Sequence, residues 1–134
     1  MTGLTAVLLY AGWTMLLALI YASPRVPQVL MGKKPADAWT RGKPSVDPAI
    51  LVRANHAHMN CVENFALFAA VVVVAALMQK SPVVDAVAAW ILCARVAQST
   101  VHLIGTSFIL VLIRATLFLV QVALLFWVIW NLLH

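Results

Sequence analysis

Four apolar runs, each long enough to cross a bilayer as a helix, are the feature that most constrains how this chain folds. They lie near residues 4–22, 48–79, 83–105 and 108–133, and about 20 apolar residues span the hydrocarbon core of a membrane. Of the 134 residues, 64% are hydrophobic and 10% are charged. We therefore predict an all-α integral membrane protein in which residues 1–134 form a single domain, a four-transmembrane-helix bundle.

The connection over residues 23–47 carries most of the positive charge of the chain. It holds five of the nine Lys and Arg residues, namely Arg25, Lys33, Lys34, Arg41 and Lys43. Loops rich in Lys and Arg face the cytoplasm, so we expect this loop on that side and both termini on the opposite side, in a bacterial inner membrane. The loop lacks the interleaved aromatic residues of a nucleic-acid surface. Anionic headgroups of membrane lipids explain its charge better, and we expect no nucleic-acid partner.

The sequence of the same loop predicts irregular structure within it and the start of the helix that follows. It contains four prolines and two glycines, which argue against a regular element. Asp47 and Pro48 read as an N-cap followed by proline at the first helical position. A helix over 48–79 would be about 48 Å long, which is longer than the hydrocarbon core, so its first turns should project into the cytoplasm.

A stripe of polar residues runs along this second predicted span, where a purely structural helix would be apolar. At about 100° per residue its members fall within about 100° of one another. Burying one of the charged members in hydrocarbon would cost about 2.5–3.5 kcal/mol, so such residues usually meet a partner or bind a ligand. The stripe consists of Arg53, His56, Asn60, Glu63 and Asn64.

The third span has a polar stripe of its own, and we expect the two stripes to meet between the helices. Its members are Arg95, Gln98, Ser99, His102 and Thr106, and Arg114 opens the fourth span. Arginine binds carboxylates through two hydrogen bonds, Glu63 can receive an ammonium group, and the Asn60, Asn64 and Gln98 amides can hold a peptide. The surplus of cations therefore predicts a small peptide-like anion as the ligand.

A purely structural alternative stays open for these residues. In it, Glu63 is neutralised by Arg95, and the Asn and Gln side chains hold neighbouring spans together by hydrogen bonds. The two cysteines, Cys61 and Cys93, both fall within spans, and their spacing fits neither a disulfide framework nor a zinc site. We predict no metal site.

The polar helix resembles the signature of the MAPEG family, the membrane-associated proteins in eicosanoid and glutathione metabolism. The family pattern is Arg-Ala-(His or Gln)-x-Asn-x-x-Glu followed by Asn, Thr or Tyr, and His58, Asn60, Glu63 and Asn64 match it in register. Arg95, Gln98, Ser99 and His102 occupy the polar places of the family's third helix. Arg114 matches the arginine that begins the fourth, and Arg25 the basic residue after the first.

This chain departs from the family at two positions of the motif. The arginine four residues before the Asn is His56 here, with Arg53 one turn earlier as a possible substitute. The ligand-contacting tyrosine of the third helix is His102, which puts a tyrosine-dependent step in doubt.

The resemblance implies a homotrimer that binds glutathione as co-substrate between neighbouring subunits near the cytoplasmic face. It implies a membrane-bound glutathione transferase, with possible peroxidase activity, acting on a hydrophobic small-molecule or lipid substrate, in the class of detoxification enzymes. Arg114 would stabilise the thiolate, with Ser99 or His102 as alternative hydrogen-bond donors. The peptide backbone and carboxylates would be held by Arg25, Arg53, His56, Asn60, Glu63, Asn64, Arg95 and Gln98.

Two other function classes stay open at this point. One branch of the family binds and presents lipids without glutathione chemistry, and the histidine at position 102 favours such a non-catalytic lipid- or glutathione-binding protein. A small four-helix exporter with Glu63 as the proton-coupled carboxylate would also fit the length and span count. That third class predicts a dimer that is indifferent to glutathione.

Overall fold

The computed structural model describes residues 1–134 and contains five helices. They are α1 (Gly3–Ala22), α2 (Arg25–Leu30), α3 (Ala49–Leu77), α4 (Ser81–Ile104) and α5 (Phe108–Leu133). Four helical segments are long and apolar enough to cross a membrane, with α1 and α2 together forming the first. The prediction of an all-helical membrane protein with four spans is therefore confirmed. Each long helix begins and ends within two residues of its predicted span.

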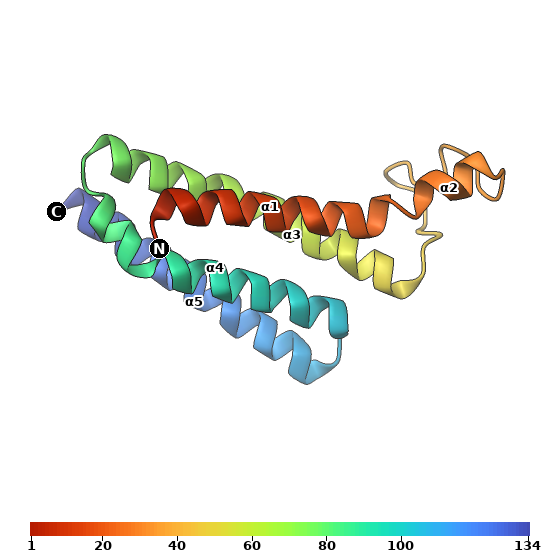
Figure 1. The fold of residues 1–134 in the computed structure, drawn as a ribbon. Helices are drawn as coiled ribbons and strands as arrows, with labels where there is room; N and C mark the ends of the chain where they lie inside the picture. Colours follow the sequence, from red (N-terminus) through yellow and green to blue (C-terminus); the bar gives the residue numbers. More distant parts are fainter.

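The helices pack as two antiparallel pairs that cross each other (Figure 1). Helix α1 lies along α3, α5 lies along α4, and α4 also packs against α3 and α1. Both termini and the α3–α4 turn lie at one end of the molecule, and α2 and the α4–α5 turn lie toward the other. This arrangement agrees with a topology in which both termini share one side of the membrane.

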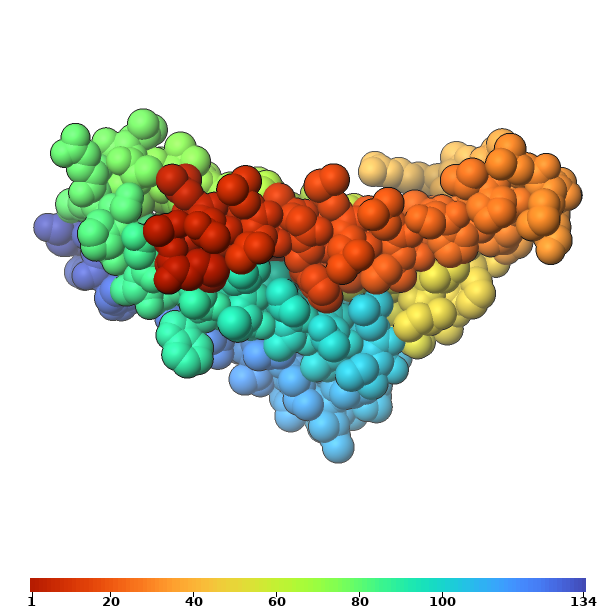
Figure 2. Space-filling model, in the orientation of Figure 1, coloured from red at the N-terminus to blue at the C-terminus, as the bar shows by residue number.

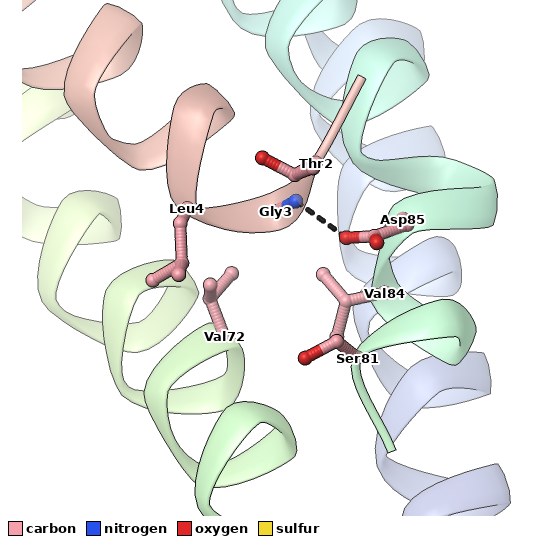
Figure 3. Close-up of a pocket in the computed structure, with 7 residues that line it drawn as sticks. All are labelled: Thr2, Gly3, Leu4, Val72, Ser81, Val84 and Asp85. Atoms are coloured by element: carbon pink, nitrogen blue, oxygen red, sulfur yellow. Dashed lines mark hydrogen bonds between the residues drawn. The ribbon is translucent and has the colours of Figure 1, made fainter. Parts of the chain in front are cut away.

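The packing of α1 at its N-terminus depends on a glycine (Figure 3). The backbone N–H of Gly3 donates a hydrogen bond of 2.6 Å to Oδ1 of Asp85 on α4. A Cβ atom at this position would lie 2.8 Å from Cγ1 of Val84 and 3.1 Å from Cγ1 of Val72. The absent side chain thus lets the helix end approach α4 closely enough for the carboxylate to meet the positive end of the helix dipole.

Two local interactions close the turn between α3 and α4. Gln79 adopts the left-handed conformation (φ 59°), and Lys80 N–H then donates to the carbonyl of Ala75 at 2.9 Å, as in a Schellman ending. The Lys80 ammonium donates to the Leu132 carbonyl at 2.9 Å. A lysine of one turn thereby satisfies a free carbonyl at the C-terminal end of α5.

The structure corrects two predictions about the long connection. It is not without regular structure, because α2 forms within it. Pro27 is tolerated because it stands in the first turn, where a backbone N–H has no helical partner. Asp47 is not an N-cap either: Pro48 occupies the cap position of α3 and gives it no side-chain cap. The Asp47 carboxylate is bound by Arg25 and Trp39 instead.

The apolar core lies between α1, α3 and α4 and is centred on Tyr10. This ring stands edge-on to Phe65 at 5.4 Å between centroids, and its hydroxyl donates to the Cys61 carbonyl at 3.2 Å. Helix α5 contributes only Gln121, Val128 and Leu132 to the buried set. Most of its side chains are therefore left to face lipid or another chain.

Candidate functional site

Three members of the polar stripe of α3 meet α4. Because the helices are antiparallel, early residues of one stripe meet late residues of the other. Arg53 Nε donates to the Leu103 carbonyl at 3.0 Å. One turn away, the rings of His56 and His102 lie 6.2 Å apart between centroids. Deeper along the same interface, Arg95 meets Asn60. The structure therefore brings Arg53, His56 and Asn60 of the α3 stripe to α4, whereas Glu63 of the same stripe does not face α4.

Arg95 is a buried cation without a carboxylate partner. Its side chain is 2% exposed, and Nη1 donates to Oδ1 of Asn60 at 2.5 Å. The guanidinium carbon lies 5.7 Å from the centroid of the Tyr10 ring, within the range of a cation–π contact. Its buried Nε has no hydrogen-bond partner. A buried charge of this kind has hydrogen-bonding capacity left for another group.

Two further polar residues of α4 are occupied by contacts between helices. Ser99 Oγ donates to the Arg95 carbonyl at 2.9 Å and lies 3.3 Å from Sγ of Cys61. The Gln98 side-chain oxygen accepts from Nε2 of Gln121 on α5 at 3.0 Å. Both contacts are buried, so these two side chains hold α3, α4 and α5 in register.

A group of cationic and imidazole side chains lies where α3, α4 and α5 approach one another near the α4–α5 turn. We call it the basic cluster, and it consists of Arg53, His56, His102 and Arg114. The His56 and His102 rings lie 6.2 Å apart, Arg53 donates to the carbonyl of the residue after His102, and Arg114 lies on the second turn of α5. Arg114 is half-buried, and its Nε is buried without a hydrogen-bond partner.

No acidic side chain neutralises the basic cluster. The two ion pairs of the chain join Arg25 to Asp47 and Lys43 to Asp37, and the other two acids, Glu63 and Asp85, form none. An anion is therefore the ligand that this cluster would stabilise most.

Glu63 and Arg25 stand apart from this arrangement. Glu63 lies on the exposed outer face of α3 and forms no ion pair, so the alternative in which Arg95 neutralises it is wrong. The Arg25 guanidinium donates to Oδ2 of Asp47 through Nε at 3.2 Å and Nη2 at 2.7 Å. Within one protomer, neither residue joins the basic cluster. Asn64, half-buried beside Glu63, donates to the Asn60 carbonyl at 2.8 Å.

Comparison with protein families gives one result that covers nearly all of this chain. The MAPEG family model matches residues 3–134. The chain belongs to the MAPEG family. Comparison with curated proteins gives no match, and neither does comparison with solved structures. Membership supports a membrane-associated role in glutathione or eicosanoid metabolism, in a family that holds both enzymes and non-catalytic members.

The chemistry of glutathione, which MAPEG proteins use, can be compared with the donors found here. A tripeptide with two carboxylates and one amine calls for several cations, amide groups and one acid, and the two stripes contain these groups. The cavity that Arg95 lines has a volume of about 10 Å³, room for a single water molecule. The donors fit the ligand, but the space at Arg95 does not hold it inside one protomer.

Two residues with polar groups that line this cavity were not among the candidates from sequence. Tyr10 of α1 and Gln121 of α5 line it together with Asn64 and Arg95. Gln121 could have been found as the one amide in an otherwise apolar stretch of the fourth span. For Tyr10 there is no comparable signal, because an aromatic residue in a membrane helix is ordinary.

Proposed function

We propose that this MAPEG protein is a membrane-bound glutathione transferase with glutathione-dependent peroxidase activity toward hydrophobic electrophiles. The observation that carries the proposal is the basic cluster at the α3–α4–α5 junction, which has no acid within it. Arg114 approaches it from α5, and Arg53 and His56 from α3. A second unneutralised cation, Arg95, lies deeper along the same interface and holds Asn60. Such a set suits a ligand that carries two carboxylates and a sulfur that must become an anion.

Arg114 is the residue that we assign to the thiolate. A free thiol with a pKa near 8.5 is only a few per cent ionised at neutral pH, and lowering that pKa to about 6.5 takes about 2.7 kcal/mol. A half-buried guanidinium with an unpartnered Nε can supply that stabilisation by a charge-assisted hydrogen bond. His102 is the better second donor, because the Ser99 hydroxyl is already used within the helix interface.

The remaining candidates hold the peptide in place. Arg53, Asn60, Asn64 and Arg95 bind its carboxylate and amides, and Glu63 receives its amine. Gln98 supports this set through its bond to Gln121. His56 and Arg25 contact the outer carboxylates, and Arg25 does so through Nη1, the guanidinium nitrogen that makes no bond to Asp47.

We place the site between neighbouring subunits of a homotrimer. Two observations support this placement: Glu63 is exposed on the protomer, and the cavity at Arg95 holds no more than a water. A second subunit against the outer face of α3 would enclose Glu63 and complete the walls of a larger site. The hydrophobic substrate would then enter from the lipid phase.

The test combines binding with turnover in detergent-purified protein. Glutathione binding is measured at equilibrium, and turnover with 1-chloro-2,4-dinitrobenzene, in which a sulfur–carbon bond forms and chloride leaves. For peroxidase activity, two thiols reduce one lipid hydroperoxide to an alcohol and water and form a disulfide. Saturable binding together with either turnover supports the proposal, and absence of glutathione binding overturns it.

A second candidate is a MAPEG protein that binds glutathione or lipid without catalysis. The observation in its favour is His102, which stands where the ligand-contacting tyrosine of the resemblance would be. Saturable binding of glutathione without turnover of either substrate would favour this candidate, and replacing His102 by tyrosine would then be expected to restore turnover.

A further inference from the structure

The connection between α1 and α3 is a folded lobe. We call residues 24–47 the surface lobe. Its first and last parts are joined by Arg25, which donates twice to the Asp47 carboxylate, and by Trp39, whose Nε1 donates to the other carboxylate oxygen at 2.8 Å. The Asp47 side chain is 1% exposed. Ordering a connection of this length costs conformational entropy, so a buried ion pair that closes it indicates a defined surface.

Further contacts fix the cationic side chains on this lobe. The Lys34 ammonium donates to the Val46 carbonyl at 2.5 Å and lies 5.8 Å from the Trp39 ring centroid. The Arg25 guanidinium lies 5.2 Å from the same centroid. The only exposed ion pair joins Lys43 to Asp37 at 2.6 Å. Trp39 and Asp47 therefore organise the lobe from within.

Three cations of the surface lobe have no acidic partner. The two lobe acids, Asp37 and Asp47, are used by Lys43 and Arg25. The side chains of Lys33 and Arg41 are exposed and make no hydrogen bond, and Lys34 meets only a backbone carbonyl. The lobe thus presents three unneutralised positive charges on a short stretch of chain.

Large apolar side chains are exposed beside these charges. Val26, Leu30 and Met31 are 60%, 81% and 60% exposed, in a lobe with no apolar core to receive them. The segment Gly3–Leu30, which contains α1 and α2, comprises 28 residues, or about 42 Å at the rise of a helix, against about 30 Å for the hydrocarbon core. The lobe extends beyond the end of the α4–α5 hairpin (Figure 2), so with α1 across the hydrocarbon core we expect it at the depth of lipid headgroups.

We propose that the surface lobe is a binding site for anionic phospholipids, with Lys33, Lys34 and Arg41 on the headgroup phosphates and Val26, Leu30 and Met31 in the apolar layer beneath. Juxtamembrane cations gain binding energy from anionic lipids near the surface. Exposed aliphatic side chains beside them fit the boundary between headgroups and acyl chains. The charge of the lobe selects the headgroup, and its internal ion pair keeps the cations together.

The test uses the full-length protein titrated with phosphatidylglycerol and, separately, with phosphatidylcholine, with bound lipid counted by native mass spectrometry. Wild type is expected to prefer phosphatidylglycerol. The double variant Lys33→Gln with Arg41→Gln should weaken phosphatidylglycerol binding by about 25-fold, at about fivefold for each cation removed. The matched control is Asp37→Asn with Lys43→Gln, which alters the same lobe at unchanged net charge and should keep the preference.

Two outcomes would overturn the proposal. One is that wild type and the variant without Lys33 and Arg41 prefer phosphatidylglycerol over phosphatidylcholine to the same degree. The other is a smaller oligomer when Leu30 and Met31 are both replaced by serine, which would show that a second copy of the chain covers this apolar surface. Glutathione turnover in detergent should be the same in all these variants, so the outcome is independent of the proposed activity.

Discussion

Of the residues in the proposed site, Arg114 has the most demanding chemical role, because it must stabilise the thiolate of the ligand relative to its thiol. Its half-buried guanidinium keeps an unpartnered Nε within the basic cluster. In Arg114→Ala we expect glutathione to bind with little change, while the ultraviolet absorbance of the thiolate that appears on adding glutathione is lost. Arg114→Lys should keep part of that absorbance, since it retains the charge but not the planar fork. Undiminished absorbance in the alanine variant would remove Arg114 from this role.

Glu63 allows a prediction in which binding and stability separate. It makes no hydrogen bond or ion pair in the protomer and is exposed, so Glu63→Gln should leave the thermal unfolding temperature unchanged. If it receives the ligand's amine, glutathione affinity should fall by about tenfold, or about 1.4 kcal/mol. Titration calorimetry beside thermal unfolding measures both effects. A large loss of stability with unaltered affinity would contradict the assignment.

Sequence periodicity predicted which residues share an interface, but it did not predict their partners. The stripe positions of Asn60 and Arg95 were enough to place these two side chains between α3 and α4. That Arg95 binds an amide while Glu63 faces outward depends on how far each helix is rotated, since one residue of a helix turns by about 100°. Their opposite charges predicted an ion pair between Glu63 and Arg95, but the rotation of α3 about its axis directs Glu63 outward.

Among the structural elements, the long helices were predicted closely because hydropathy and length determine them. The short helix α2 was missed, since four prolines and two glycines in its connection suggested irregular chain. The position of Pro27 in the first turn makes that helix possible. Asp47 failed as a cap for a different reason: its carboxylate gains more from Arg25 and Trp39, and these contacts arise only when the connection folds back.

The docking of α1 on α4 supports a prediction about stability. Asp85 accepts from the Gly3 N–H at 2.6 Å, so Asp85→Ala leaves that N–H unsatisfied and removes a negative charge from the helix N-terminus. We expect a loss of about 1–2 kcal/mol in unfolding free energy, measured by denaturant titration in detergent. The matched control is Asp37→Ala, which breaks an exposed pair and should cost well under 1 kcal/mol. Equal effects of the two substitutions would contradict this account of the helix end.

For the whole molecule, the decisive quantity is the number of chains in the particle. Three chains of 14.6 kDa each are expected by native mass spectrometry in mild detergent, with up to three molecules of glutathione bound. The exposed side chains of α5 and the outer face of α3 are the surfaces available for such contacts. A dimer with drug-dependent proton flux and no response to glutathione would instead favour the exporter class.

If the site lies between subunits, its residues can be supplied by different chains. The Arg25 side chain is held by Asp47 in the surface lobe, whereas Arg114 lies on the second turn of α5 and belongs to the basic cluster. We therefore expect the two residues to reach one ligand from two different subunits. Arg25→Gln and Arg114→Ala should each lower turnover when expressed alone.

Mixed trimers of these two chains should regain activity, because an Arg114→Ala chain still supplies Arg25 and an Arg25→Gln chain still supplies Arg114. In every trimer that contains both chains, one of the three interfaces combines two intact residues, so the turnover of the mixed particles should return to about a third of the wild-type value. The measurement uses two differently tagged chains purified by both tags in turn, and thermal unfolding checks that Arg25→Gln has not disrupted the surface lobe. Mixed particles no more active than the single variants would mean that both arginines serve sites within one chain, or that Arg25 contacts no ligand at all.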